Sequence, residues 1–291
     1  MKALIVGVTG MLGHQVYLKF LQSGVFTDVR GTIREQKDIL QQYRFFAEKK
    51  IYDKVDLSSD GFVLLRNIVD DYQPHIVINC VVRKNDGARQ EEYLLTNSFL
   101  PHYLAKLLKT KGGKLVHIST DGVFSGNKGN YSENDIPDSV DLYAKSKFYG
   151  EVDYDHHLTI RTSLFGHELL GRKTGLVEWF LNSQVQSVQG YTNVHFSGIS
   201  TNLLAKIILH LIHLKATGIL HIGSYQKISK HDLLSLINNE YGTQKTIIPI
   251  ELPHSINRSL QVTKMRRLRV SVPGYPDMIQ TMREEHLSLE A

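Results

Sequence analysis

The sequence predicts an α/β fold in which a doubly wound parallel sheet is followed by a smaller C-terminal α/β lobe. An apolar segment at residues 3–8 runs into a glycine-rich turn and then into a helical pattern at 14–21. Apolar segments of strand length then alternate with helical patterns five or six times before residue 165. Repeats of this kind specify parallel strands joined by right-handed crossovers.

Length and composition limit the classes of protein to consider. The 291 residues can bury a large core, as one domain or as a domain with a lobe. No segment approaches the ~18 apolar residues of a membrane span, and no signal peptide precedes the first strand. The single cysteine, Cys80, fits a reducing compartment. We therefore expect a cytoplasmic protein without a membrane partner. The net charge of +5 is too small to indicate a nucleic-acid partner.

The turn after the first strand has the spacing G-x-x-G-x-x-G, a variant of the dinucleotide fingerprint. A glycine turn between strand and helix lets backbone N–H groups approach a pyrophosphate at the helix N-terminus. A turn kept only for tight packing is the less favoured alternative, because the motif stands at the first strand. The residues expected to bind the cofactor here are Gly7, Thr9, Gly10, Met11, Leu12 and Gly13.

The second strand, residues 28–33, ends at Arg34. An NAD site usually has Asp or Glu at this place, whereas Arg accommodates the 2′-phosphate of NADP. Arg34, with Lys37 as a second candidate, therefore indicates NADPH. NADH stays open because Glu35 is adjacent to Arg34. The alternative interpretation of Arg34 is a solvated charge at the end of a strand. The third strand, 51–55, leads to Asp56 and Leu57, where a carboxylate could accept a hydrogen bond from an adenine amine.

A helix at 61–72 precedes the fourth strand, 75–82, whose continuous apolar character indicates a parallel strand covered on both faces. Cys80, Val81 and Val82 end it and are expected to lie against the cofactor. Arg83 and Lys84 follow at the carboxyl edge, where doubly wound sheets bind ligands. They are either phosphate contacts or loop charges. The next helix carries Asn97, a further candidate for cofactor binding, and leads to the fifth strand at 114–119.

The central catalytic candidate is the helical segment from Tyr143 to Lys147. A tyrosine and a lysine four residues apart share a helix face, and an adjacent ammonium lowers the pKa of a phenol from its usual ~10. A hydroxyl from Ser119 or Thr120 could hold a carbonyl against the phenol, so that the set protonates a ketone as hydride arrives. A surface pair is the alternative. Tyr241 and Lys245 have the same spacing, which we interpret as chance.

A sixth strand at 158–164 ends the regular alternation, which loosens beyond residue 166. Trp179 lies on an amphipathic segment, and its ring is expected either to pack in the core or to face a sugar. Next come an apolar helix at 202–215 and a strand at 218–222. A capping box at Ser229 then begins a helix at 230–241. The basic patch Lys264, Arg266, Arg267 and Arg269 is either a solvated face or a diphosphate-binding edge. We predict a dinucleotide-binding domain at 1–165, onto which 195–225 packs back, and a lobe at 166–291 that mainly binds substrate.

Four motifs together resemble the extended short-chain dehydrogenase/reductase family, whose dinucleotide-binding domain has the Rossmann fold. They are the glycine turn 7–13, the segment 117–126 (HISTDGVFSG), the segment 143–147 (YAKSK) and Arg161-Thr162-Ser163. The chain is most similar to the branch that contains dTDP-4-dehydrorhamnose reductase and its sugar-nucleotide relatives. The resemblance covers residues 1–165 well and the remainder loosely.

The resemblance implies that Tyr143 is the proton donor, that Lys147 is its partner and also binds the nicotinamide ribose, and that Thr120 orients the carbonyl. The glycine turn would line the pyrophosphate, Asp56 and Leu57 the adenine, and Val81 and Val82 the nicotinamide side. The candidate substrate contacts are Asp121, Arg83, Lys84 and Trp179.

Three departures from the family pattern refine these expectations. Gly122 stands where the rhamnose-pathway enzymes have Tyr, and Leu164 where some have Trp, so dTDP-rhamnose is not implied as the product. Gln15 replaces a glutamate that helps to hold magnesium in some members, so no metal is expected. Sugar-nucleotide 4,6-dehydratases have a glutamate at the position of Gly122, and glycine cannot act as their base.

The resemblance therefore implies an NADPH-dependent reductase of the 4-keto group of a nucleotide-activated deoxysugar. Its product would enter surface polysaccharide or deoxysugar biosynthesis, and its partner is a nucleotide-diphosphate sugar. A homodimer stays open. The alternatives are a sugar-nucleotide epimerase on the same fold and a non-catalytic NADP-binding regulatory subunit.

Overall fold

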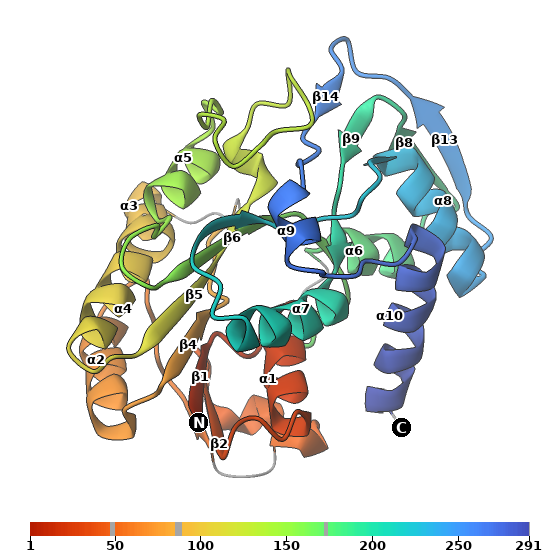
Figure 1. Cartoon of the computed structure of the whole chain (residues 1–291). Coiled ribbons are helices and arrows are strands. Elements are labelled where there is room, and N and C mark those ends of the chain that lie inside the picture. Colours follow the sequence, from red (N-terminus) through yellow and green to blue (C-terminus); the bar gives the residue numbers. More distant parts are fainter. Residues whose placement is uncertain (47–49, 85–88, 172–173, 291) are drawn as a thin grey trace.

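The computed structural model describes residues 1–46, 50–84, 89–171 and 174–290. Its centre is a seven-stranded sheet with the order β11-β6-β5-β4-β1-β2-β3, in which every pair of neighbouring strands is parallel (Figure 1). The predicted doubly wound sheet is confirmed. Its strands are β1 (Lys2–Val6), β2 (Asp28–Thr32), β3 (Ile51–Tyr52), β4 (Ile76–Asn79), β5 (Lys114–Thr120), β6 (Leu158–Thr162) and β11 (Gly218–His221).

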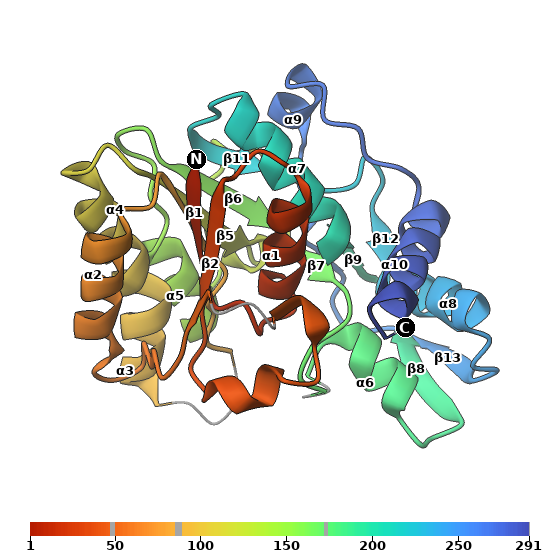
Figure 2. The same cartoon turned by 90° about the horizontal axis from the view of Figure 1, so that it is seen from below.

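Helices cover both faces of this sheet, which explains why the central strands β1 and β4 are almost entirely buried. On one face pack α2 (Gly61–Tyr72) and α4 (Leu100–Lys109), with α5 (Leu142–Tyr149) beside them; α1 (Gly13–Gln22) and α7 (Thr201–His213) lie on the other (Figure 2). Side chains of β1 alternate between the two faces: Ala3 and Ile5 contribute to one core cluster, and Leu4 and Val6 to the other.

The segment before β11 returns to the sheet from the second half of the chain. Helix α7 packs against α1, and β11 pairs with β6 in register Leu220 to Ile160. Shorter elements connect the main strands: η1 (Lys37–Leu40), η2 (Arg44–Phe46), α3 (Gln90–Tyr93), the π-helical turn η3 (Leu94–Phe99) and η4 (Asp121–Val123).

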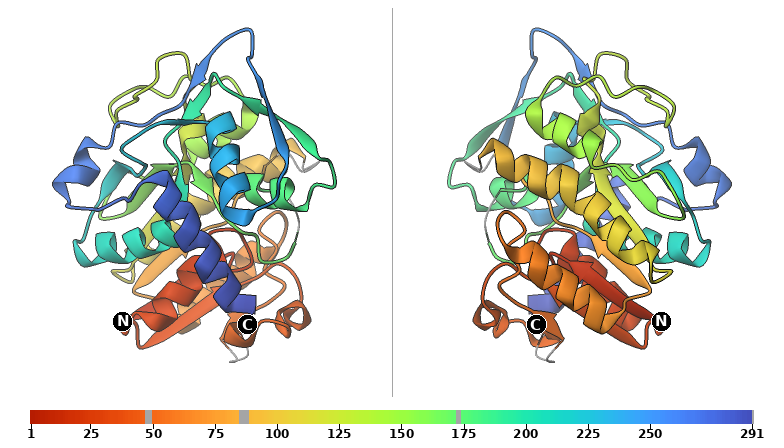
Figure 3. Two further views of the ribbon diagram at one scale, coloured as in Figure 1. Left: turned by 90° about the vertical axis from the view of Figure 1, so that its right-hand side faces the viewer. Right: turned by 90° about the vertical axis from the view of Figure 1, so that its left-hand side faces the viewer.

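The remaining elements build a smaller region beside the carboxyl edge of the sheet (Figure 3). Strand β8 (Ser187–Tyr191) pairs with β13 (Thr246–Ile250), β9 (Val194–Phe196) lies between β12 (Ile228–Ser229) and β14 (Ile256–Asn257), and β7 (Leu164–Phe165) pairs with β10 (Ile199–Ser200). The helices here are α6 (Leu176–Asn182), α8 (Lys230–Tyr241), α9 (Thr263–Arg267) and α10 (Tyr275–Glu290).

Helix α8 begins as its sequence predicts. The hydroxyl oxygen of Ser229 accepts a hydrogen bond from the backbone N–H of Asp232 at 2.9 Å. The helix ends at Gly242, which takes a left-handed conformation with φ of 61°. Across the described ranges, no helix combines the length and the apolar character that a membrane crossing requires.

Candidate active site

A cleft of about 1020 Å³ runs along the carboxyl edge of the central sheet. Its walls come from the segments that follow β1, β2, β3, β4 and β5, and from α5. Lys230 and Arg258 close it from the smaller region. This is the edge at which open α/β sheets bind ligands, because the strand order reverses there and the loops diverge.

The glycine turn forms the floor of the cleft at the start of α1. Gly7 adopts a φ of 87°, which favours glycine, and its N–H donates to the carbonyl oxygen of Thr32 at 3.2 Å. A Cβ added to Gly13 would lie 2.0 Å from the carbonyl oxygen of Gly7, so only glycine lets α1 begin this close to the turn. The turn residues that line the cleft are Gly7, Thr9, Gly10, Met11 and Leu12, and Gly13 packs beneath them.

At one end of the cleft lie charged residues that follow β2 and β3. The guanidinium of Arg34 lies 3.5 Å from a carboxylate oxygen of Glu35, and 45% of the Arg34 side chain is exposed. Asp56 accepts hydrogen bonds from the backbone N–H (2.9 Å) and hydroxyl (2.6 Å) of Ser58. Burial works against the charge of Asp56, but these hydrogen bonds hold its pKa below the usual value. Leu57 lines the cleft beside it.

The segment after β4 lies beside the glycine turn, where a Cβ added to Gly7 would come within 2.8 Å of Cγ2 of Val81. Its residues that line the cleft are Cys80, Val81, Val82, Arg83 and Lys84. Asn97 has no exposed surface and lies behind this segment in η3. Its amide accepts from the N–H of Arg83 and donates to the carbonyl of Arg83, both at 2.9 Å, and donates to the hydroxyl of Ser146 at 3.0 Å. Asn97 therefore joins the β4 loop to α5 and is not among the residues that line the cleft, where our sequence analysis expected it to bind the cofactor.

Thr120, Tyr143 and Lys147 meet in the cleft, from the end of β5 and from α5. The two hydroxyls that the sequence offered differ in their partners. Ser119 donates to Glu151 at 2.7 Å, and Glu151 forms a buried two-bond ion pair with Arg161. The hydroxyl of Thr120 donates to a carboxylate oxygen of Asp121 at 3.3 Å and accepts from the backbone N–H of Gly122 at 3.0 Å, and it lies close enough to Tyr143 to lower the pKa of the phenol. Of the two, Thr120 is the residue beside the phenol.

The electrostatics of this set differ from the prediction. The ammonium of Lys147 donates to the carbonyl oxygen of Ile118 at 2.7 Å and lies 3.4 Å from Nε2 of His117. Burial lowers the pKa of Lys147 to about 7. Burial also raises the pKa of Tyr143, and the nearby hydroxyl of Thr120 offsets this only in part. The expected lowering of the tyrosine pKa by the ammonium was wrong for this arrangement, because Lys147 bonds to the β5 backbone.

Three charged residues surround the far end of the cleft. Asp121 is buried; burial raises its pKa, and the charges of Lys230 and Arg258 oppose that rise. Lys230 is the first residue of α8, and its ammonium lies 3.8 Å from the centre of the Phe196 ring. Nε of Arg258 donates to the carbonyl oxygen of Phe124 at 3.0 Å. Our sequence reasoning missed Lys230 and Arg258 as site residues, because only tertiary structure brings them to the cleft.

Other candidates lie away from the cleft. Trp179 is on the outer side of α6 with 43% of its surface exposed, so both interpretations, core packing and a sugar-facing ring, were wrong. The patch at Lys264, Arg266, Arg267 and Arg269 is exposed and is the solvated face. Tyr241 and Lys245 have separate partners, His167 and Ser183, which confirms that their spacing is chance.

Comparisons with known proteins agree with this arrangement. A zebrafish protein named methionine adenosyltransferase 2 subunit beta is 23% identical over 94% of this chain and 87% of its own. A probable low-salt glycan biosynthesis reductase, Agl14 of Haloferax volcanii, is 26% identical over 100% and 98% of the two chains. A crystal structure described as a hypothetical dTDP-4-dehydrorhamnose reductase from Sulfolobus tokodaii superposes with a TM-score of 0.76 at 25% identity, covering 94% of this chain and 98% of that one.

The family resemblance predicted from the motifs is also confirmed by a match along most of the sequence. The family profile described as the RmlD substrate binding domain matches residues 1–273. The match extends well beyond the sheet into the smaller region, where the motif resemblance was loose. The chain therefore belongs to the family of proteins with an RmlD substrate binding domain.

Proposed function

We propose that this chain is an NADPH-dependent reductase of the 4-keto group of a nucleotide-activated deoxysugar, acting in the cytoplasm in surface polysaccharide or deoxysugar synthesis. The observation that carries the proposal is the meeting of Thr120, Tyr143 and Lys147 in the same cleft as the glycine turn. The names of the Haloferax and Sulfolobus relatives support a reductase.

The residues present fit a nicotinamide dinucleotide. The turn from Gly7 to Leu12 presents backbone N–H groups and the N-terminus of α1 to the cleft, which suits a pyrophosphate. Arg34 offers a cation for a 2′-phosphate, and Asp56 offers carboxylate oxygens for an adenine amine. When bound, the nicotinamide supplies a hydride to the carbonyl carbon.

The chain's own residues supply the proton and the orientation. Tyr143 is protonated at neutral pH, as is any phenol whose pKa lies at or above the usual ~10, and it donates that proton to the carbonyl oxygen. The hydroxyl of Thr120 holds that oxygen beside the phenol. Lys147, with a pKa of about 7, places a titratable cation in the same cavity, where its charged form would bind the ribose hydroxyls of the nicotinamide half of the cofactor.

The far end of the cleft suits an anionic substrate. Lys230 and Arg258 carry two positive charges against the one carboxylate of Asp121, and Lys84 also lines the cleft. Arg83 instead lies toward the Asp56 end, where it donates to the hydroxyl of Ser58 and forms an ion pair with Glu92 at 2.9 Å. Charge-assisted hydrogen bonds to phosphate are among the strongest available in a protein site. A nucleotide-diphosphate sugar meets this requirement, with its keto group toward Tyr143.

The test is NADPH oxidation against a panel of dTDP-, UDP- and GDP-linked 4-keto-6-deoxysugars, with Tyr143→Phe alongside the natural chain. Loss of a positioned general acid costs on the order of 10²- to 10⁴-fold in turnover. We expect a fall of that size with NADPH affinity nearly unchanged. Tyr149→Phe, on the same helix and 63% exposed, is the matched control and should keep full turnover. Unchanged turnover in Tyr143→Phe would refute the assignment.

A regulatory subunit is the second candidate, and the similarity to methionine adenosyltransferase 2 subunit beta favours it. A protein of that kind would keep the cofactor site and act by binding a partner enzyme. NADPH binding without oxidation by any member of the panel, together with a stoichiometric partner on purification, would support this candidate over the reductase.

A further inference from the structure

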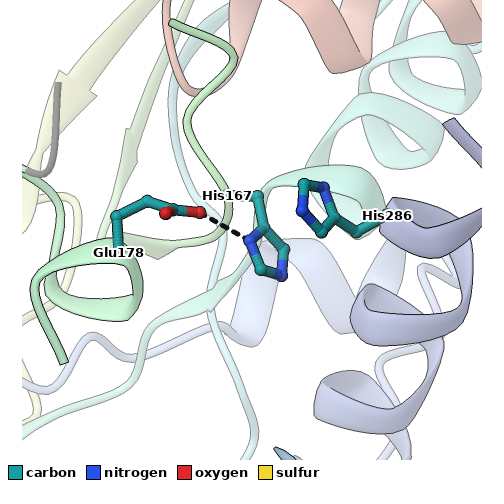
Figure 4. Close-up of side chains that lie close together, drawn as sticks. All are labelled: His167, Glu178 and His286. Atoms are coloured by element: carbon teal, nitrogen blue, oxygen red, sulfur yellow. Dashed lines mark hydrogen bonds and ion pairs between the residues drawn. The ribbon is translucent and has the colours of Figure 1, made fainter. Parts of the chain in front are cut away.

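A cluster of two imidazoles and a carboxylate lies outside the cleft, where α6, α10 and the segment after β7 come together. Figure 4 shows Glu178 of α6 directed at His167, with the ring of His286 of α10 beside it. Oε1 of Glu178 lies 2.6 Å from Nδ1 of His167, and the two imidazole rings stack with centres 3.5 Å apart. His167 and Glu178 are buried, and His286 is partly buried. One potential ligand atom from each residue lies within 4.8 Å of the other two.

The surroundings hold two of these side chains in place from behind. Nε2 of His167 is hydrogen-bonded to the hydroxyl of Tyr241 at 2.7 Å, which directs the Nδ1 edge toward Glu178. The second oxygen of Glu178 accepts from the amide of Asn182 at 2.8 Å. Metal-binding histidines and carboxylates typically have such outer hydrogen bonds, which fix the ring and its tautomer.

We propose that His167, Glu178 and His286 bind one divalent transition-metal ion of the zinc class, with water as the fourth ligand. Two imidazole nitrogens and one carboxylate are a known zinc ligand set, whereas Mg²⁺ and Ca²⁺ prefer oxygen ligands alone. Ligand atoms on a tetrahedral zinc ion lie roughly 3.4 Å apart, given bonds of about 2.0–2.1 Å. To reach this geometry, the 2.6 Å contact between Glu178 and His167 would open by roughly 1 Å to admit the ion, and the ring of His286 would tilt toward both.

The site is separate from the proposed reductase chemistry and does not depend on it. His286 is distant in sequence from His167 and Glu178, so a bound ion would cross-link α10 to α6 and to the segment after β7. Leu176 at the start of α6 lines the cleft. Metal binding would therefore stabilise the fold and fix one part of the cleft wall. Our sequence analysis expected no metal because Gln15 replaces a glutamate, and it did not consider these three residues, whose spacing matches no metal-binding motif.

The test is calorimetric titration of the full chain, without an affinity tag and stripped with a chelator, with Zn²⁺. We expect one ion per chain with a dissociation constant in the micromolar range or tighter, a rise in Tm, and no binding of Mg²⁺. Co²⁺ should give the visible absorption of a four-coordinate ion. His286→Ala should weaken Zn²⁺ binding at least tenfold and abolish both the rise in Tm and the Co²⁺ spectrum.

The matched control is His213→Ala, which removes an exposed histidine at the end of α7 and should change none of these results. The control is needed because the chain has 14 histidines. If His286→Ala does not fold, Glu178→Gln, which keeps the side-chain shape, should weaken Zn²⁺ binding at least tenfold. No binding by the natural chain, or equal binding by the ligand variant and the His213→Ala control, would overturn the proposal.

Discussion

Replacing Arg34 by Ala tests how the cleft distinguishes the two nicotinamide cofactors. Arg34 follows β2 and lines the end of the cleft, at the position where dinucleotide-binding folds contact the adenine ribose. Its guanidinium would hydrogen-bond to a 2′-phosphate, which NADPH has and NADH lacks. The variant should therefore lose affinity for NADPH and keep its affinity for NADH.

The size of the loss follows from the surroundings of Arg34. A hydrogen bond to a charged group contributes about 1.5–3 kcal/mol. The side chain is 45% exposed and its guanidinium lies 3.5 Å from Glu35, so solvent and a competing carboxylate reduce the gain. We therefore take the lower part of the range, about 1.5–2 kcal/mol, which corresponds to roughly a 10- to 30-fold rise in the dissociation constant of NADPH.

The assay is calorimetric titration of each cofactor, because the single tryptophan, Trp179, is exposed on α6 and would report poorly on the cleft. Arg66→Ala is the matched control, since Arg66 is an exposed arginine of α2 whose partner is Asp70. It should bind both cofactors as the natural chain does. An equal loss for NADPH and NADH in Arg34→Ala, or no loss for either, would refute contact with a 2′-phosphate.

Two further predictions concern the reaction and its substrate. The pKa of Lys147 is lowered from 10.5 to about 7, so its charged form is lost as pH rises through about 7. Turnover at saturating substrate should therefore fall over that pH range. A pH profile of turnover that is flat across the range would contradict the role of the ammonium. Lys230→Met should raise the KM of the sugar nucleotide about tenfold, because it removes one charge-assisted hydrogen bond to the substrate. NADPH binding should not change. Lys227→Met, which changes an exposed lysine three residues earlier, is its control, and equal KM values for the two variants would exclude Lys230 from substrate binding.

The sheet and the glycine turn could be predicted from sequence because both depend on local patterns. An apolar strand, a turn with glycines at fixed spacing and an amphipathic helix follow one another within about twenty residues, and the structure places them in that order. The steric need for glycine at position 13 is equally local, since its neighbour is the carbonyl of Gly7.

The details of the candidate site depend on contacts between distant segments, which the sequence does not show. Choosing between Ser119 and Thr120 requires the position of Glu151, which takes the hydroxyl of Ser119. The four-residue spacing places Tyr143 and Lys147 on one helix face, yet it does not reveal that the carbonyl of Ile118 lies within 2.7 Å of the ammonium. An apolar helical pattern likewise did not show that Trp179 would be exposed.

The two ends of the cleft therefore differ in how readily a change of sequence alters them. The glycine turn depends on close backbone approach, so substitutions at Gly7 or Gly13 disturb the start of α1 as well as a bound cofactor. The far end depends on side chains alone: Lys230 and Arg258 project from α8 and from the segment after β14 onto the fixed edge of the sheet. Changing them alters the charge presented to a sugar nucleotide while leaving the strands in register. Substrate choice in this chain should thus respond to substitutions in its last third that leave cofactor binding intact.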